Sequence, residues 1–172
     1  ETQDLAVWAA QLCDALGYAH EQARLVHRDL KPSNLMISSK GDLKLADFGI
    51  AREVSDTMSR VTGRTSTAGT LTHMSPQQLG GDPPKLTDDI YSLGATFYDM
   101  LTSKPPFYSG NVALQVLDKT PPPMAQRRAE LGIQGAAIPT EWETVIAACL
   151  AKDPILRPQS AHDVALMLGL GD

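Results

Sequence analysis

The sequence lacks the features of a nucleic-acid-binding or a membrane-spanning protein. It has 15 basic against 20 acidic side chains, a formal net charge of -5 and no basic tract, so neither nucleic acid nor an anionic membrane surface is an expected partner. No apolar run approaches the ~20 residues that a transmembrane helix needs, and there is no cleavable signal. We expect a cytoplasmic segment without membrane contact, although a longer parent protein could carry an anchor elsewhere.

Cysteine is also scarce. The two cysteines, Cys13 and Cys149, stand in helical patterns among alanines and leucines. This setting predicts buried free thiols in a reducing compartment, with a disulfide between them as the alternative. Of the 172 residues, 42% are hydrophobic, which is enough for one compact domain with its own core over residues 1–172.

The spacing of apolar residues predicts a mostly α-helical fold with one small β-hairpin. Residues 3–23 carry apolar side chains at three- and four-residue steps, which is typical of an amphipathic helix. Residues 87–102 are apolar on nearly every side, which indicates a buried helix. Two short apolar segments, 35–38 and 43–46, flank a turn-like sequence and predict the hairpin. Shorter helical patterns follow near 111–117, 142–150 and 161–168.

The segment 27–34, with the sequence HRDLKPSN, concentrates groups that suit phosphoryl transfer from a nucleotide. Asp29 can orient a substrate hydroxyl and accept its proton, and Lys31 can neutralise charge on the transferred group. Asn34 and the later Asp47 offer oxygen ligands of the kind that Mg²⁺ prefers. Outside this motif, a lone Asp on a loop is more often a turn or cap residue, and a lone Lys a solvated charge.

A strand-register argument connects the two candidate metal ligands. If Ser38 faces Leu43 across the turn, then Asn34 lies directly opposite Asp47. Directly opposed residues have Cβ atoms about 4.5–5.5 Å apart. The sequence therefore predicts a cation site with two ligands at the open end of the hairpin.

The segment 27–34 and the triplet Asp47 to Gly49 together resemble the catalytic and metal-binding loops of eukaryotic-type (Hanks-type) serine/threonine protein kinases, of the kind found in bacterial signalling as well as in eukaryotes. The resemblance extends from about residue 3 to residue 168. It implies the large, carboxyl-terminal lobe of a kinase, with a catalytic loop over 27–34 and an activation segment over 47–77.

The resemblance also implies a cofactor and a substrate. ATP with Mg²⁺ would donate its γ-phosphoryl group to serine or threonine hydroxyls of a protein substrate. Asn34 and Asp47 would hold the metal, and Met36 matches the position that packs beneath the adenine. His27 and Phe48 match residues that pack and hold the backbone, and Phe48 also switches the loop between active and inactive states.

The activation segment supplies further candidates by resemblance. Thr70, after a glycine, matches the threonine whose hydroxyl meets the catalytic Asp and Lys in serine/threonine kinases. Thr65 and Thr67 are candidate phosphorylation sites, and Arg28 would clamp the added phosphate. Asp89 matches the acid that holds the backbone around the catalytic loop; a helix amino-terminal cap is the alternative interpretation.

One position departs from the family pattern. Kinases close the activation segment with Ala-Pro-Glu, whose carboxylate pairs with a later arginine, whereas this chain has Ser-Pro-Gln over residues 75–77. Arg157 matches the arginine. Because Gln77 can accept a hydrogen bond but not form an ion pair, we expect a weaker contact without a direct loss of chemistry.

The 172 residues contain no glycine-rich phosphate loop, no strand lysine for the nucleotide phosphates and no glutamate to pair with it. We therefore expect that an amino-terminal lobe is missing, that the isolated fragment is inactive and that it binds ATP and Mg²⁺ weakly or not at all. Exposed apolar side chains at the cleft would favour self-association. The alternatives are a small-molecule phosphotransferase of the aminoglycoside-kinase kind and a non-catalytic interaction module.

Overall fold

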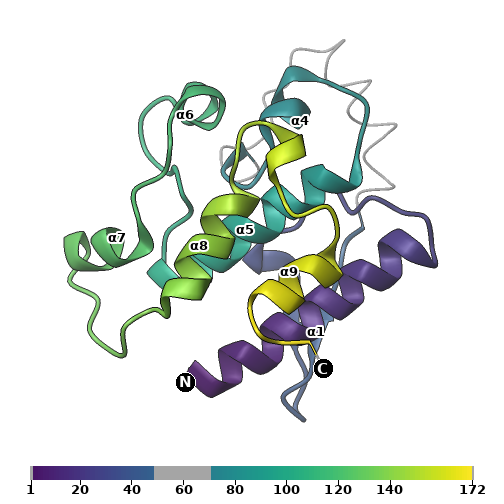
Figure 1. Ribbon diagram of the computed structural model, residues 1–172, viewed down its shortest axis with the longest axis horizontal. Helices are drawn as coiled ribbons and strands as arrows, with labels where there is room; N and C mark the ends of the chain where they lie inside the picture. The colour runs from purple at the N-terminus through teal and green to yellow at the C-terminus, as the bar shows by residue number, and fades with distance from the viewer. Residues whose placement is uncertain (1, 49–70, 172) are drawn as a thin grey trace.

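The computed structural model describes residues 2–48 and 71–171, and its elements are mainly helical (Figure 1). The predicted fold class, mostly α with a small β-hairpin, is confirmed for this part of the chain. In chain order the elements are α1 (Thr2–Glu21), the 3₁₀ helix η1 (Pro32–Asn34), β1 (Leu35–Ile37), β2 (Leu43–Leu45), α4 (Pro76–Gly80), α5 (Leu86–Thr102), α6 (Val112–Asp118), α7 (Met124–Glu130), α8 (Thr140–Cys149), the 3₁₀ helix η3 (Pro154–Leu156) and α9 (Ala161–Met167).

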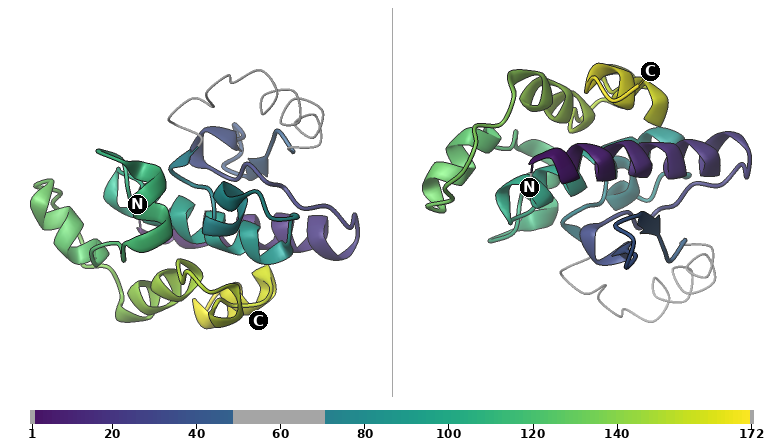
Figure 2. Two further views of the ribbon diagram at one scale, coloured as in Figure 1. Left: turned by 90° about the horizontal axis from the view of Figure 1, so that it is seen from above. Right: turned by 90° about the horizontal axis from the view of Figure 1, so that it is seen from below.

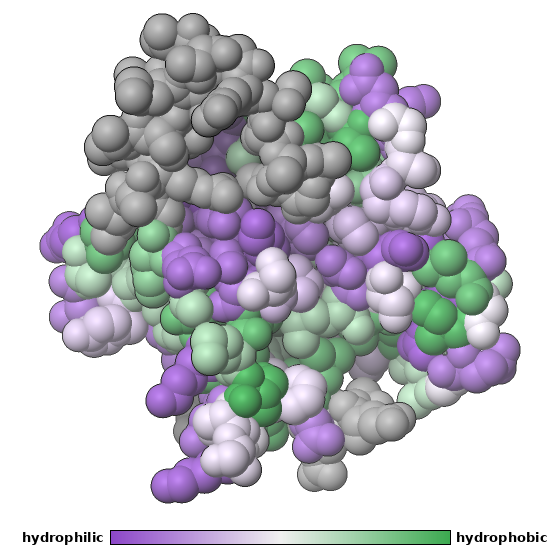
Figure 3. All heavy atoms as spheres, turned by 180° about the vertical axis from the view of Figure 1, so that it is seen from behind, coloured by the Kyte–Doolittle hydropathy of each residue, from purple (hydrophilic) through white to green (hydrophobic). Residues whose placement is uncertain are grey.

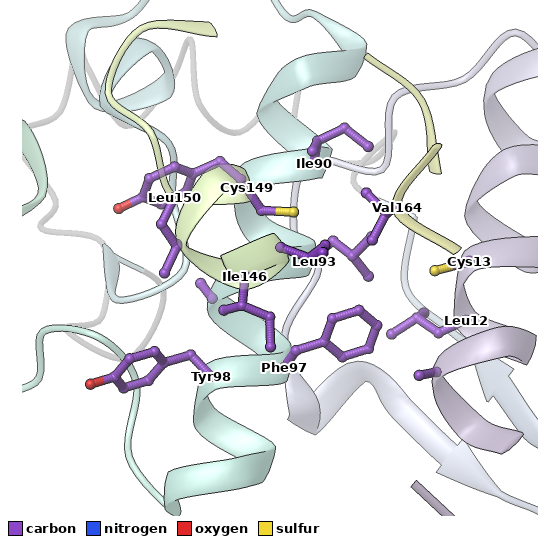
Figure 4. Packing of buried hydrophobic residues seen from close by; sticks show 14 of the residues in the cluster. Leu12, Cys13, Ile90, Leu93, Phe97, Tyr98, Ile146, Cys149, Leu150 and Val164 are labelled. Atoms are coloured by element: carbon purple, nitrogen blue, oxygen red, sulfur yellow. The ribbon is translucent and has the colours of Figure 1, made fainter. Parts of the chain in front are cut away.

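Helix α5 is the buried centre of the molecule. It packs against α7, α8 and η1, and Figure 2 shows α8 and α9 on one side of it and the hairpin on the other. Its apolar side chains, among them Leu93 and Phe97, meet Ile146 and Cys149 of α8 in the core (Figure 4). A Cβ atom on Gly94 would lie 2.5 Å from Cys149 Cβ, so this close helix crossing requires glycine.

Helix α1 connects the carboxyl-terminal helix to the hairpin, since it packs against both α9 and β2. Its inner face buries Leu12 and Leu16 as the apolar stripe predicts. Two polar contacts reach from α1 to the hairpin: Trp8 Nε1 donates to Gly41 O at 3.1 Å, and Gln11 Oε1 accepts from Leu43 N at 2.7 Å. These contacts set the position of the hairpin relative to the core.

The hairpin forms, but its predicted register is wrong by one residue. Leu35 pairs with Leu45 and Ile37 with Leu43, so Asn34 lies opposite Ala46 rather than Asp47, and Ala46 N donates to Asn34 O at 2.9 Å. The reason is the turn. It has a loop of three residues that ends at Gly41 with φ 86°, where the prediction assumed four.

The cysteine prediction is confirmed: Cys13 and Cys149 are both buried and free. Burial raises the pKa of each thiol from its ordinary value to about 12. No helix within residues 2–48 and 71–171 has the length and apolarity to cross a bilayer.

Candidate active site

The catalytic-loop motif is attached to α5 through one buried carboxylate. Asp89 accepts hydrogen bonds from His27 N at 2.6 Å and from Arg28 N at 2.8 Å. Arg28 adopts the left-handed backbone conformation, with φ 71°, which costs free energy for a residue other than glycine. The two bonds to Asp89 compensate this strain and fix the direction in which the chain enters the motif.

His20, at the end of α1, is a third partner of Asp89. Its Nε2 lies 2.7 Å from Asp89 Oδ2, and both side chains are buried. The sequence analysis missed His20. Its neighbours in the sequence give no signal, because its partner lies 69 positions away in the chain.

The helix-cap interpretation of Asp89 is not what the structure has. Asp88, its neighbour, accepts from the backbone N of Lys85, the N-cap residue of α5, at 2.8 Å and from Ser75 Oγ at 2.6 Å. The two adjacent carboxylates therefore have different partners: Asp88 closes the start of α5, and Asp89 binds the catalytic loop.

The His27 side chain connects the catalytic loop to the end of β2. Its Nδ1 accepts from Asp29 N at 3.2 Å, so the ring proton belongs on Nε2, which donates to Ala46 O at 2.9 Å. The ring also lies 4.6 Å from the Phe48 ring, centroid to centroid. These contacts are of the packing and backbone-holding kind that the sequence predicts for both residues.

Asp29, Lys31 and Asn34 lie together. Asn34 Nδ2 donates to Asp29 O at 2.7 Å and to Asp29 Oδ2 at 3.1 Å, and Lys31 Nζ is 3.5 Å from the same carboxylate oxygen. The Asp29 side chain is 10% exposed, so it is held but not sealed from solvent. Because both Asn34 Nδ2 partners are acceptors, the amide orientation is fixed. No described residue donates to Asn34 Oδ1, which suits a cation ligand.

Asp47 is exposed and lies one residue beyond the Ala46 partner of Asn34. Its φ of 55° takes the chain out of the strand conformation two residues after the end of β2. The direct opposition of Asn34 and Asp47 is therefore not present, but both residues stand at the same open end of the hairpin.

Two successive apolar side chains of β1, which point to opposite faces of the hairpin, are exposed. Met36 pairs with Lys44 and is 61% accessible, and Ile37 next to it is 47% accessible. Seen from behind in Figure 3, the hydrophobic side chains gather in separate patches between hydrophilic ones.

Comparison with known proteins assigns this arrangement to a family. The model of the protein kinase domain matches residues 1–166. The chain belongs to the protein kinase domain family. The resemblance predicted from the catalytic-loop motif is thus confirmed.

Similar kinases come from bacteria. The chain is 37% identical over 158 residues to the serine/threonine-protein kinase PknB of Mycolicibacterium smegmatis. The matched region is 90% of this chain and 24% of that protein. The chain is 37% identical over 161 residues to a probable PknB of Corynebacterium glutamicum, with 92% and 24% coverage. The chain thus spans about a quarter of the length of the curated relatives it matches.

The contact that the family resemblance predicts between residue 77 and a later arginine is present, with glutamine in place of glutamate. Arg157 Nη2 donates to Gln77 Oε1 at 2.7 Å, and its other donors reach Ala151 O, Thr87 O and Lys152 O at 2.7–3.0 Å. Arg157 is 2% exposed. Its burial lowers the guanidinium pKa, and the nearby Asp88 opposes this shift.

Two further residues of the segment before α5 were missed by the sequence analysis. Gln78 Nε2 donates to Arg28 O at 3.0 Å, so α4 contacts the catalytic loop directly. His73 Nε2 lies 3.1 Å from Asp99 Oδ2, and His73 O accepts from Ser92 Oγ at 2.7 Å. Both contacts cross long sequence distances and carry no local signal.

The activation-segment candidates Thr65, Thr67 and Thr70 lie outside the described residues, as does Gly49 of the metal-binding triplet. Their predicted roles therefore stay predictions.

Proposed function

We propose that this chain is the catalytic-loop part of a serine/threonine protein kinase that transfers the γ-phosphoryl group of ATP to serine or threonine hydroxyls of protein substrates. The observation that carries the proposal is the cluster of Asp29, Lys31 and Asn34 at the end of the hairpin. The side chains of Asn34 and Lys31 lie 3.1 Å and 3.5 Å from the same carboxylate oxygen of Asp29. Membership of the protein kinase domain family and the names of the bacterial relatives support it.

In this proposal Asp29 orients the accepting hydroxyl and takes its proton, because its carboxylate is partly exposed and its backbone is fixed on both sides. Lys31, whose ammonium already lies beside Asp29, neutralises charge that develops on the transferred group. Thr70 would complete this group as the residue that meets Asp29 and Lys31.

The residues present fit Mg²⁺ and ATP. Asn34 Oδ1 and the Asp47 carboxylate are hard oxygen donors at one end of the hairpin, and they would hold the metal. When bound, Mg²⁺ neutralises phosphate charge and orients the phosphates for in-line transfer. Met36 would pack beneath the adenine through its exposed side chain. The groups for the remaining phosphate contacts are not in this sequence, so we propose that another lobe supplies them.

The remaining roles follow the same proposal. Arg28 would bind a phosphate on Thr65 or Thr67, which would order the activation segment. His27, Phe48 and Asp89 keep the loop in position through their contacts, and Gln77 with Arg157 fixes the end of the segment. The buried free thiols support a reducing, cytoplasmic location.

The decisive experiment measures transfer of labelled phosphate from ATP to a protein by the full-length protein. Asp29→Asn should lower kcat about 10²–10⁴-fold. Asp42→Asn, which removes an equivalent carboxylate from the exposed hairpin turn, should leave kcat unchanged. Equal activity of the two variants would contradict the role of Asp29. We expect negligible transfer by the 172 residues alone, since positioning supplies most of the catalysis.

Two other functions are separated by the same assay. Transfer by the full-length protein to a sugar or an aminoglycoside, and to no protein, would establish the small-molecule phosphotransferase. Absence of all transfer with intact folding would favour an interaction module. Because Met36 and Ile37 are exposed, we further propose that the isolated chain self-associates; a concentration-independent monomer in sedimentation would contradict this.

A further inference from the structure

A cavity of about 630 Å³ lies apart from the candidate active site. It is formed by α8, the start of α7 and the proline-rich loop 120–123 that precedes α7. It shares no lining residue with the catalytic loop or the hairpin. Figure 4 shows Tyr98, Ile146 and Leu150, three of the side chains that line it. Its volume falls in the range of small-molecule sites, about 300–1,000 Å³.

The walls of the cavity are mainly apolar and are held in place. Ile146, Leu150 and Met124 supply buried apolar surface. Tyr98 OH donates to Pro122 O at 2.8 Å, which fastens the proline-rich loop to α5 and uses the hydroxyl. An apolar body would therefore fit this space without leaving the tyrosine hydroxyl unpaired.

Two charged side chains line the cavity, and only one of them has its charge balanced by close partners. Both carboxylate oxygens of Glu143 accept backbone N–H groups, from Met124 at 3.0 Å and from Ala125 at 2.7 Å. Lys152 Nζ donates to Val116 O at 2.6 Å and lies 4.9 Å from the centre of the Phe107 ring. Within the described residues no carboxylate oxygen comes within 4.0 Å of it, and two of its three donors have no protein acceptor.

The surroundings of Lys152 also favour an added anion. Burial and, to a smaller extent, the neighbouring Arg157 lower its pKa to about 8, and Asp118 opposes both effects. A carboxylate at this point would relieve the repulsion between two adjacent cations. The cavity thus combines an apolar interior with a lining lysine whose ammonium has no carboxylate partner among the described residues.

We propose that this cavity binds an apolar monocarboxylic acid, whose hydrocarbon body lies between α8 and the proline-rich loop and whose carboxylate pairs with the Lys152 ammonium. The site is separate from the phosphoryl-transfer site and does not depend on the proposed kinase activity. Glu143 would disfavour a second carboxylate on the ligand, because its charge lies on the same cavity wall.

The test is calorimetric titration of the 172-residue chain with 4-phenylbutyrate and, as the uncharged control, 4-phenylbutan-1-ol. We expect saturable 1:1 binding of the acid and binding of the alcohol weaker by about tenfold or more. Lys152→Met should weaken binding of the acid by a similar factor and leave the affinity for the alcohol unchanged. Lys119→Met, which removes an exposed lysine outside the cavity, should change neither.

A second variant tests the cavity without removing the charge. Ala147 lines the cavity and is exposed, so Ala147→Trp should fill the space and abolish binding of both compounds while circular dichroism stays native.

Affinity for the acid should also fall as pH rises above about 8, where free Lys152 loses its proton. Absence of saturable binding, equal affinity for acid and alcohol, or undiminished binding to Ala147→Trp would each overturn the proposal. If Lys152→Met does not fold, the acid–alcohol difference and Ala147→Trp decide.

Discussion

Asp89 and Arg157 are both buried charges that fix a functional segment to α5, but they meet different kinds of partner. Asp89 accepts from two backbone amides and from His20, so its negative charge is offset by strong donors on the catalytic loop and on α1. Arg157 donates to three backbone carbonyls and to the Gln77 amide, all of them neutral. Its nearest compensation by charge comes from Asp88 at longer range.

The difference shows which of the two attachments can be changed with less damage. The bonds to Asp89 hold the strained Arg28 backbone, so losing them releases the catalytic loop itself. The bonds from Arg157 hold the start of α4 through Gln77, and a better partner can be introduced there. The Asp89 carboxylate already accepts from three donors, whereas the Arg157 guanidinium has no carboxylate in direct contact within the part of the chain that the structure describes.

The largest expected effect comes from breaking the first attachment. Asp89→Ala leaves the amides of His27 and Arg28 buried without acceptors, and should lower the free energy of unfolding by about 3–5 kcal/mol. Urea unfolding followed by circular dichroism measures this. Asp82→Ala, an exposed acid before α5, should cost less than about 0.5 kcal/mol. Equal costs would show that Asp89 does not fix the loop.

Removing only the imidazole partner should have a smaller effect. His20→Phe keeps the bulk but removes one of the three donors to Asp89, and should cost about 1–3 kcal/mol. The matched control is His162→Phe on the exposed side of α9, which should be nearly neutral. A cost for His20→Phe as large as that for Asp89→Ala would mean that the amide bonds contribute little.

The second attachment should respond in the opposite direction. Gln77→Glu gives Arg157 the missing counter-charge but loses the bond that Gln77 Nε2 donates to Lys152 O at 3.0 Å, so the net stabilisation should be at most about 1 kcal/mol at pH 7. The pairing lowers the pKa of the new carboxyl, so the gain should disappear as pH falls below about 4. Gln78→Glu is the contrast, because it removes the amide that donates to Arg28 O and should destabilise. Stabilisation by both substitutions would contradict this account.

The smallest expected effect is a pH dependence near Arg157. Burial lowers the pKa of Lys152 from 10.5 to about 8, so between these values the unfolded state binds more protons than the folded state. The free energy of unfolding should therefore rise with pH across this window. The buried thiols act in the opposite sense above about 9. The difference between wild type and Lys152→Met cancels the thiol effect, and it should increase between pH 7.5 and 9.5; a constant difference would contradict the shift.

Most of the architecture follows from local patterns. The stripe over residues 3–23 corresponds to α1 (Thr2–Glu21), and the all-round apolar segment to the buried α5 (Leu86–Thr102). The hairpin was also predictable, but not its register. Ser38 Oγ accepts from Lys40 N and Asp42 N, which tightens the turn to three loop residues and shifts every pair by one.

What the sequence could not supply is the choice of partners across the fold. His20, Gln78 and His73 act through residues 69, 50 and 26 positions away. Such contacts depend on how helices pack, and periodicity reports only which face of a helix is buried. It does not report which polar group of a neighbouring element lies against that face.

The sequence by itself determined the helices, the hairpin and the set of side chains that can carry phosphoryl-transfer chemistry, because these depend on the order and spacing of residue types. The family resemblance pointed to Asp89 and left a helix cap as its alternative role, and only the tertiary structure decided that Asp89 binds the loop while the adjacent Asp88 closes the start of the helix. The two are chemically identical, but successive residues of an α-helix point about 100° apart. Asp88 therefore meets Ser75 and the start of its own helix, and Asp89 meets the catalytic loop.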